Sequence, residues 1–582
     1  MTLRLRSLCA VLALASCAGP SESGPLEPAD LVVHHAKVVT VDRDFRIAEA
    51  IAVKDGRIVA VGDDAEIFRR VGPKTKVIDA EGYPLLPGLY DSHVHLLGAS
   101  TSEAEGPLPD VPSLEDGLKQ IREKAAASPE GTWIVLRYAF PTRLKEMRFP
   151  TLAELDAAAP RHPVLWHAGP AGMVNTRALQ ISGITKETRD PPAGQVVRDP
   201  KTGEATGMIR NAYQLLKGVP ARVPVTDPAA QREAILRLLT LYNEQGITSV
   251  ADRNAGRETV DRCLELQKEG RLTCRVNIAR SFSAGGSDDE IRRRFDELPG
   301  ADGRGGPTGA GDEWVRIGPI KLFMDGGMLN GSAYMRQPWP PGPTYQIVES
   351  DYRGMLFIPP DRLRMILEEG AKRGWQMTAH TAGEGAMDSL LDAYADVAKK
   401  HPGVKDRRWC ITHANFPSLR NLERCRELGV TADIQPAWLW KDGATLAKVL
   451  GPERIRWFQP FKSWLEHTTI GGGSDHMIRL DSFRATNPWN PWLGMWITLK
   501  REVASGEVLV PDERLTREQA LRLYTINNAY LHHEEKERGS IEVGKLADFI
   551  LIDRDVLTCP LDAVPDTKVL GTFVGGRQVS GR

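Results

Sequence analysis

Two histidines stand one residue apart in the stretch PGLYDSHVHLLG, residues 87–98. Side chains on a β-strand alternate between the two faces of the sheet, so His93 and His95 should point to one side and Val94 to the other. Imidazoles on one face can hold a divalent metal ion. The pair therefore predicts part of a metal site, although an isolated pair is also typical of an ordinary polar strand end.

Four further potential ligands follow apolar runs later in the chain. They are Lys321 in IKLFMDGG, His380 in MTAHTAGEG, His413 in CITHAN and Asp475 in GGGSDH. Each one alone has an ordinary structural explanation; Asp475, for example, could cap a helix. Together with the histidine pair, however, they recur at five different runs. That recurrence favours one shared site over five unrelated structural roles.

The elements that must position these residues are short apolar runs alternating with amphipathic segments. One run precedes His93, and the other seven cover residues 246–252, 272–279, 315–325, 375–381, 407–414, 429–436 and 468–475. Eight strands alternating with helices predict an α/β fold of the (β/α)₈ TIM-like barrel type. In such a barrel the chemistry gathers at the C-terminal ends of the strands, where the six candidate ligands stand.

At 582 residues the chain is longer than one domain needs. We expect residues 87–530 to form the barrel, with a long insertion after its first strand, over 99–230, that could roof the site. Hairpin-like β-rich runs near the two termini, over 31–86 and 538–582, are expected to pair into one small composite β-sandwich domain.

The first 17 residues, MTLRLRSLCAVLALASC, join two arginines to an apolar run too short to span a bilayer, which is typical of a signal peptide. The ending LASC resembles the bacterial lipobox, in which the cysteine becomes the lipidated first residue. We therefore predict an exported bacterial lipoprotein, anchored through Cys17 on the periplasmic or cell-surface side, with residues 18–30 as a tether. A plain signal peptide with an incidental cysteine is the alternative.

The charge balance indicates no polyanionic partner. Lys plus Arg number 75 and Asp plus Glu 76, so the chain lacks the basic footprint of a nucleic-acid-binding protein. The expected partner is a small-molecule substrate, and a homo-oligomer stays open. Beyond Cys17 the five widely spaced cysteines fit neither a zinc finger nor a dense disulfide framework. They are expected to be mostly buried thiols, with one disulfide left open: Cys263, Cys274, Cys410, Cys425 and Cys559.

Five motifs stand in the order in which they occur in the amidohydrolase superfamily. These are PGLYDSHVH, IKLFMDGG, HTAGEGAMD, GSD and the closing GSIEVGKLADFILID. The chain resembles in particular the subgroup that contains N-substituted formamide deformylase, over nearly its whole length after the signal segment. The resemblance implies a metal-dependent hydrolase with a barrel and a small composite sheet domain.

The resemblance also implies roles for the candidate ligands. The histidine pair and Asp475 would hold one buried ion, while His380 and His413 would hold a second. Lys321 would bridge the two ions as a carbamate formed with carbon dioxide, because a protonated lysine cannot be a ligand. The expected cofactor is thus two divalent ions, with zinc as the default. Such a pair can share a hydroxide and polarise a carbonyl, and Asp475 would be the catalytic acid and base.

The sequence departs from the subgroup in three places, which puts the substrate in doubt but leaves the ligand set intact. Glu384 takes the acidic position after the fifth strand, Thr412 replaces a glutamate on the sixth, and Pro170 replaces a histidine in the insertion. Asp325, Glu384 and His476 are candidates for contacting the substrate or supporting the ligands.

Tryptophans crowd two segments that follow the seventh and eighth predicted strands. Aromatic residues at a barrel mouth could grip an apolar substrate, or they could simply pack in the core. The segments PAWLW and NPWNPWLGMW contain Trp438, Trp440, Trp489, Trp492 and Trp496.

Taken together, these features predict a metal-dependent amidohydrolase that cleaves an amide-type C–N bond of a small organic molecule by hydroxide attack. One alternative is a mononuclear deaminase or cyclic-amide hydrolase, in which Lys321 would be an ordinary rim lysine. Its ligands would be His93, His95, His380 and Asp475. The other alternative is a non-catalytic, ligand-binding surface lipoprotein. Loss of a ligand would mark that class, and the sequence retains all six.

Overall fold

The computed structural model describes residues 27–581, apart from 105, 107, 109, 222–223 and 299–306. The predicted signal peptide, Cys17 and most of the tether lie outside the described residues.

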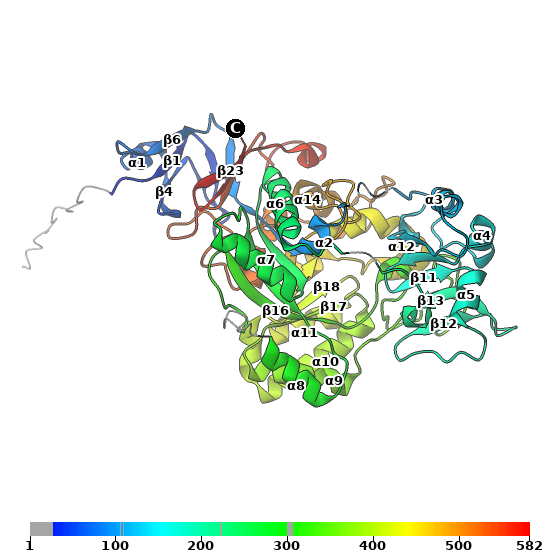
Figure 1. Ribbon diagram of the computed structural model, residues 1–582. Helices are drawn as coiled ribbons and strands as arrows, with labels where there is room; N and C mark the ends of the chain where they lie inside the picture. The colour runs from blue at the N-terminus through cyan, green and yellow to red at the C-terminus, as the bar shows by residue number, and fades with distance from the viewer. Residues whose placement is uncertain are drawn as a thin grey trace, which may run out of the picture.

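The core of the molecule is an eight-stranded parallel sheet in which each strand pairs with the next in sequence (Figure 1). The strands are β8 (Leu89–Val94), β14 (Ile247–Ala255), β15 (Arg275–Ser281), β16 (Val315–Phe323), β17 (Met377–Thr381), β18 (Cys410–His413), β19 (Thr431–Ile434) and β20 (Ile470–Gly472). A backbone hydrogen bond of 2.8 Å from Asp475 N to His93 O joins the last strand to the first. The predicted barrel and its eight strands are confirmed.

Helices cover the outside of the barrel and follow the amphipathic segments of the sequence. They are α6 (Pro228–Glu244), α7 (Arg257–Lys268), α8 (Asp288–Glu297), α9 (Pro360–Lys372), α10 (Glu384–Lys400), α11 (Leu419–Leu428), α12 (Pro436–Ile455) and α13 (Phe461–His467). Helix α11 shows why they begin and end where they do. The Ser418 side chain caps its first turn, and Gly429 ends it in the left-handed conformation at a φ of 66°.

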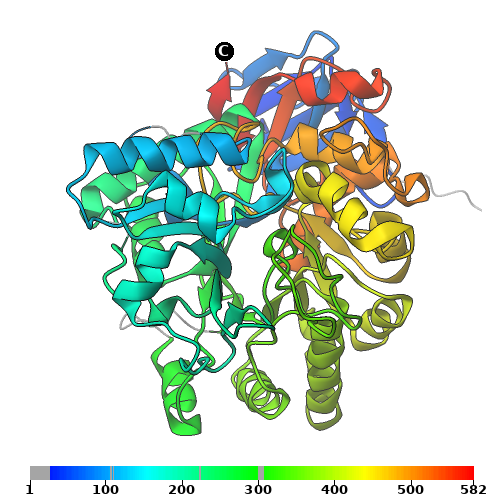
Figure 2. The same cartoon turned by 90° about the vertical axis from the view of Figure 1, so that its right-hand side faces the viewer.

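Both ends of the chain build one β-sandwich, as predicted. One sheet comprises β1 (Leu31–His34), β4 (Ala50–Lys54), β5 (Arg57–Gly62) and β6 (Lys76–Asp79). The other comprises β2 (Lys37–Val39), β3 (Ile47–Ala48), β7 (Pro84–Pro87), β21 (Phe549–Ile552), β22 (Val569–Val574) and β23 (Arg577–Gly581). In the second sheet β21 pairs antiparallel with β7. The blue and red strands therefore lie together in Figures 1 and 2.

The segment between β8 and α6 folds around a sheet of its own, which the sequence did not predict. Its five strands are β9 (Ile134–Arg137), β10 (Val164–Ala168), β11 (Ala171–Val174), β12 (Gln195–Arg198) and β13 (Ala205–Arg210). Its helices are α3 (Leu114–Ala127), α4 (Leu152–Ala158) and α5 (Thr176–Ser182). Figure 2 shows this cyan body beside the barrel. A buried hydrogen bond of 2.7 Å from Thr142 Oγ1 to Asp442 Oδ1 ties it to α12.

Shorter elements complete the described fold. The remaining α-helices are α1 (Asp64–Phe68), α2 (Leu96–Ser100), α14 (Pro491–Lys500), α15 (Arg517–Leu523) and α16 (Ile526–Leu531). The 3₁₀ helices are η1 (Pro141–Arg143), η2 (Tyr213–Leu215), η3 (Met328–Asn330), η4 (Pro402–Arg407), η5 (Pro511–Glu513) and η6 (Leu561–Asp566).

The cysteines of the described residues are free thiols. Four are buried and Cys559 is partly exposed, so the disulfide that the sequence left open does not form among them. Within the same residues, no helix has both the length and the apolar character that crossing a membrane requires.

Candidate metal centre

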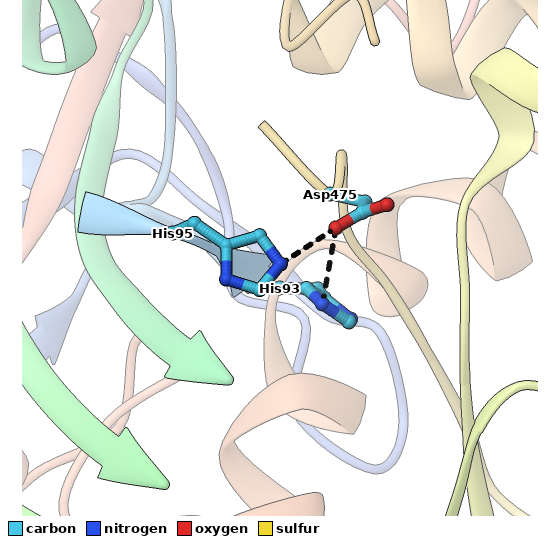
Figure 3. Close-up of side chains that lie close together, drawn as sticks. All are labelled: His93, His95 and Asp475. Atoms are coloured by element: carbon cyan, nitrogen blue, oxygen red, sulfur yellow. Dashed lines mark hydrogen bonds and ion pairs between the residues drawn. The ribbon is translucent and has the colours of Figure 1, made fainter. Parts of the chain in front are cut away.

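Three of the predicted ligands meet where the barrel closes. Oδ1 of Asp475, just beyond β20, lies 3.2 Å from Nε2 of His93 and 3.0 Å from Nε2 of His95 (Figure 3). The ligand atoms of the three residues all lie within 4.8 Å of one another. His93 is fully buried, whereas 23% of the His95 side chain is exposed. Two imidazoles and a carboxylate at this spacing can share one ion.

The second pair of histidines adjoins the first. The rings of His380 and His413 lie 4.4 Å apart, and His413 lies 4.9 Å from the ring of His93, measured between centroids. Burial and the nearby Lys321 lower the pKa of His380 to about 4. A histidine with this pKa is a neutral imidazole at neutral pH, which is the form that binds a metal.

Lys321 on β16 is 1% exposed and interacts electrostatically with the same histidines. Burial is the main cause that lowers the pKa of its side chain to about 8. A lowered pKa increases the share of neutral amine, and the neutral amine is the species that can react with carbon dioxide. The structure therefore places Lys321 in the surroundings that a carbamate would need.

Asp433, on β19, supports His93 and was missed in the sequence. Its Oδ2 lies 3.3 Å from Nδ1 of His93 and 2.8 Å from Nε of Arg253, with all three side chains buried. Although burial alone would raise the pKa of Asp433, Arg253 and His93 bring it well below the usual range. The carboxylate can accept the Nδ1 hydrogen of His93, which leaves Nε2 facing Asp475. A polar residue inside the apolar run VTADIQP was the available signal.

The rings of His413 and His380 are fixed in a similar way. Oε1 of Gln435 lies 2.8 Å from Nδ1 of His413, and the carbonyl oxygen of Gly326 lies 3.1 Å from Nε2 of His380. Each contact occupies one ring nitrogen and leaves the other for a ligand. Gln435, directly after β19, was also missed in the sequence.

The residues present fit a divalent ion. Nε2 of His93 is buried and makes no hydrogen bond to any described residue, although Oδ1 of Asp475 lies 3.2 Å from it. A metal ion shared by these two atoms would satisfy both. Although burial raises the pKa of Asp475, His93 and His95 bring it well below 3.8, so the carboxylate is ionised. Imidazole nitrogens and an ionised carboxylate form a donor set that suits zinc.

Two other predicted residues lie at the edge of the site. Asp325 is buried and accepts hydrogen bonds of 2.9 Å from the backbone N–H groups of Tyr334, Ala382 and Gly383. It thereby ties the segment after β16 to the segment after β17. Glu384 begins α10 with its Oε2 buried and unpaired among the described residues, and burial raises the pKa of its carboxyl.

Neither ring nitrogen of His476 is directed at the ligand atoms of His93, His95 and Asp475. Its Nδ1 lies 2.8 Å from the hydroxyl of Tyr242, and its Nε2 lies 2.6 Å from the carbonyl oxygen of Arg479. Both ring nitrogens are therefore occupied by groups of the chain itself, and its ring stacks on Trp489. This geometry gives His476 a structural role in the segment that follows β20.

A cavity of about 1620 Å³ lies between the insertion and the segments that follow β8, β19 and β20. Its wall includes Leu97, Tyr138, Trp440, Lys441 and Ile478. Of the five tryptophans singled out in the sequence, only Trp440 lines it. The other four are buried in packing: Trp438, Trp489, Trp492 and Trp496.

Comparisons with known proteins agree with this fold. Residues 76–580 match the model of the family described as amidohydrolase family. N-substituted formamide deformylase of Arthrobacter pascens is 26% identical, over 94% of this chain and 97% of that protein. Protein LONG AFTER FAR-RED 3 of Arabidopsis thaliana is 28% identical, over 95% and 91%. The crystal structure of an uncharacterized metal-dependent hydrolase from Pyrococcus horikoshii OT3 superposes with a TM-score of 0.63 at 21% identity, covering 91% of this chain and 99% of that one.

Proposed function

This chain belongs to the amidohydrolase family and is a metal-dependent hydrolase, and we propose that it cleaves the C–N bond of a small organic amide. The observation that carries the proposal is the contact of one Asp475 oxygen with both His93 and His95, because this places a carboxylate beside two metal-binding nitrogens. The amide substrate is further supported by the relative named N-substituted formamide deformylase.

In this proposal the six polar residues would hold two zinc ions. His93, His95 and Asp475 would hold one and His380 and His413 the other, and Lys321, as a carbamate, would contribute a ligand to both. When bound, the ions lower the pKa of a water molecule and polarise the substrate carbonyl.

The acid and base chemistry falls to Asp475. Its ionised carboxylate takes the proton that the attacking water releases and passes it to the nitrogen that leaves. Water is thereby added across the C–N bond, giving an acid and an amine. The cavity is lined by none of the six ligands, but its wall includes Leu97 and Ile478, two and three residues beyond His95 and Asp475. It would receive a part of the substrate away from the cleaved bond.

Metal analysis of the purified chain, with Lys321→Ala beside it, tests the proposal. We expect about two zinc ions per wild-type chain, fewer in the variant, and hydrolysis of at least one member of a panel of amides, esters and carbamates. One ion per chain, unchanged in the variant, would reject the bridge and favour the mononuclear deaminase or cyclic-amide hydrolase. Full metal loading without any hydrolysis would favour the non-catalytic binding protein.

We also propose that the mature chain is a lipoprotein anchored through Cys17. The support is the sequence LASC at the end of a short apolar segment. Expression in a bacterium tests this proposal. Wild-type protein should fractionate with membranes, and Cys17→Ala should not. Equal fractionation of both would leave a plain signal peptide.

A further inference from the structure

The side chain of Asn487 makes two hydrogen bonds to Asp475. Its Nδ2 donates to the backbone oxygen of Asp475 at 2.8 Å and to the carboxylate Oδ2 at 3.2 Å. Asp475 has a φ of +54°, a conformation that is uncommon for a residue other than glycine. The double contact fixes both the backbone and the carboxylate, and so leaves Oδ1 facing His93 and His95.

The orientation of the Asn487 amide is itself determined by two donors. Its Oδ1 accepts hydrogen bonds from Nε1 of Trp438 at 3.1 Å and from Nη2 of Arg143 at 3.2 Å. Both neighbours can only donate, so the oxygen must face them and the NH₂ group must face Asp475. Asn487 is 3% exposed, which shields these contacts from water.

Arg143 reaches this point from the insertion, where it ends η1. Asp442 of α12 holds its guanidinium through two hydrogen bonds, Nε to Oδ1 at 2.9 Å and Nη2 to Oδ2 at 3.0 Å. A bidentate pair of this kind fixes the plane of the guanidinium. The Asp442 side chain is fully buried and Arg143 is 12% exposed. A third contact runs from Nη1 to the carbonyl oxygen of Thr486.

We propose that Asn487 is a positioning residue for Asp475, and that Arg143 of the insertion fixes the orientation of the Asn487 amide. The inference rests on the proposed function, because the roles of Asp475 in metal binding and proton transfer come from there. The insertion therefore does more than cover the barrel: its docking on α12 aligns the carboxylate that the chemistry uses. If the insertion moved away from α12, Arg143 would lose its contact with Asn487. Asn487 would then no longer be held in the orientation that fixes Asp475.

Asn487→Asp is the sharpest variant. It preserves size and the acceptor for Trp438 and Arg143, but turns the donor toward Asp475 into an oxygen that repels it. Thr445→Val is the matched control, because it removes a buried hydrogen bond of 2.8 Å to the oxygen of Thr142 at the same contact without touching Asn487. The probe is zinc, titrated into each purified full chain against a chelator.

We expect Asn487→Asp to raise the zinc Kd about 10- to 100-fold, as loss of a group that supports a ligand typically does. Turnover should fall at least as far, in kcat rather than KM. Thr445→Val should stay within about threefold of wild type in all three quantities. In crystals, Oδ1 of Asp475 should leave His93 and His95 in Asn487→Asp and stay there in the control.

The role of the insertion needs its own variant. Arg143→Met combined with Asp442→Leu removes the bidentate Arg143–Asp442 pair without leaving a buried charge unpaired. It should raise the zinc Kd about 10-fold, and adding Asn487→Asp should cost less than the two effects combined, because both act through one chain of contacts. Additive effects would overturn the coupling to the insertion.

The outcomes separate this inference from the proposed function. A wild type that binds zinc but hydrolyses nothing would reject the proposed function, while the zinc Kd values still decide the inference. If the wild type bound no zinc, the Asp475 position in the two crystal structures would decide it. Unchanged Kd and unchanged geometry in Asn487→Asp would overturn it. If that variant does not fold, Trp438→Phe replaces it, with an expected rise of about fivefold in Kd and with an unchanged Kd again overturning the inference.

Discussion

Oε1 of Gln435 lies 2.8 Å from Nδ1 of His413, and this contact decides which nitrogen of the histidine is free. An amide oxygen can only accept, so Nδ1 carries the hydrogen and the lone pair of Nε2 is left for a ligand. Asp433 does the same for His93 from the same strand end. Two neighbouring groups on one side of the barrel thus prepare two histidines of the site.

Gln435→Met should weaken zinc binding about 10- to 100-fold, because His413 loses the acceptor that fixes its tautomer. Chelator competition measures the effect. Gln459→Met is the control: it removes another buried amide, which donates to the Gln435 backbone oxygen at 2.9 Å and touches no candidate ligand. Equal zinc affinities in the two variants would show that Gln435 does not prepare His413.

The sequence predicted the barrel well because parallel strands covered on both faces leave continuous apolar runs. The six candidate ligands stand out for a related reason: each is a polar residue at the end of such a run. Asp433 and Gln435 stand in such a run too, but nothing local distinguishes a supporting carboxylate or amide from a strand-end residue. Asn487 carries no local signal, since its partners come from the insertion, α12 and the end of β20.

The sheet of the insertion was missed for a different reason. Its strands are only four to six residues long. Two pairs, β10–β11 and β12–β13, are hairpins, but β9 pairs with β10 and β11 with β13 across other elements. Runs this short have no periodicity long enough to read. The composite sandwich was predictable because its hairpin-like runs at both termini are separated by clear turn residues.

Reconstitution of the metal-free protein should depend steeply on pH around 8. Burial lowers the pKa of Lys321 to about 8, and only the neutral amine, present above the pKa, can take up carbon dioxide. By that pKa, about a tenth of the side chains are neutral at pH 7 and about nine tenths at pH 9. At a fixed partial pressure of carbon dioxide, the initial rate of zinc uptake should therefore rise through pH 8 and then level off. A rate that is flat from pH 7 to 9, or equal in Lys321→Ala, would contradict the carbamate.

Arg253→Met should be strongly destabilising. It leaves the fully buried Asp433 carboxylate without the guanidinium that lies 2.8 Å away, and breaking a buried pair on one side costs about 3–5 kcal/mol. The midpoint of denaturant unfolding measures the loss. Arg293→Met is the control, because Arg293 and its partner Glu297 are each 66% exposed and water can replace the arginine. That variant should lose about 1 kcal/mol or less. Equal losses would mean that burial does not decide how much the Arg253–Asp433 pair contributes to the free energy of unfolding.

Tyr242→Phe tests whether His476 is structural. Nε2 of His476 donates to the carbonyl oxygen of Arg479, so Nδ1 is the acceptor and the Tyr242 hydroxyl donates to it at 2.8 Å. Removing the hydroxyl leaves a buried nitrogen unpaired, which should cost about 1–3 kcal/mol of unfolding free energy. Tyr394→Phe, whose hydroxyl makes only a 3.5 Å contact with the Cys410 oxygen, should cost less. Zinc content and KM should be unchanged in both, because His476 directs neither nitrogen toward His93, His95 or Asp475. A KM that rises in Tyr242→Phe without loss of stability would instead make His476 a substrate contact.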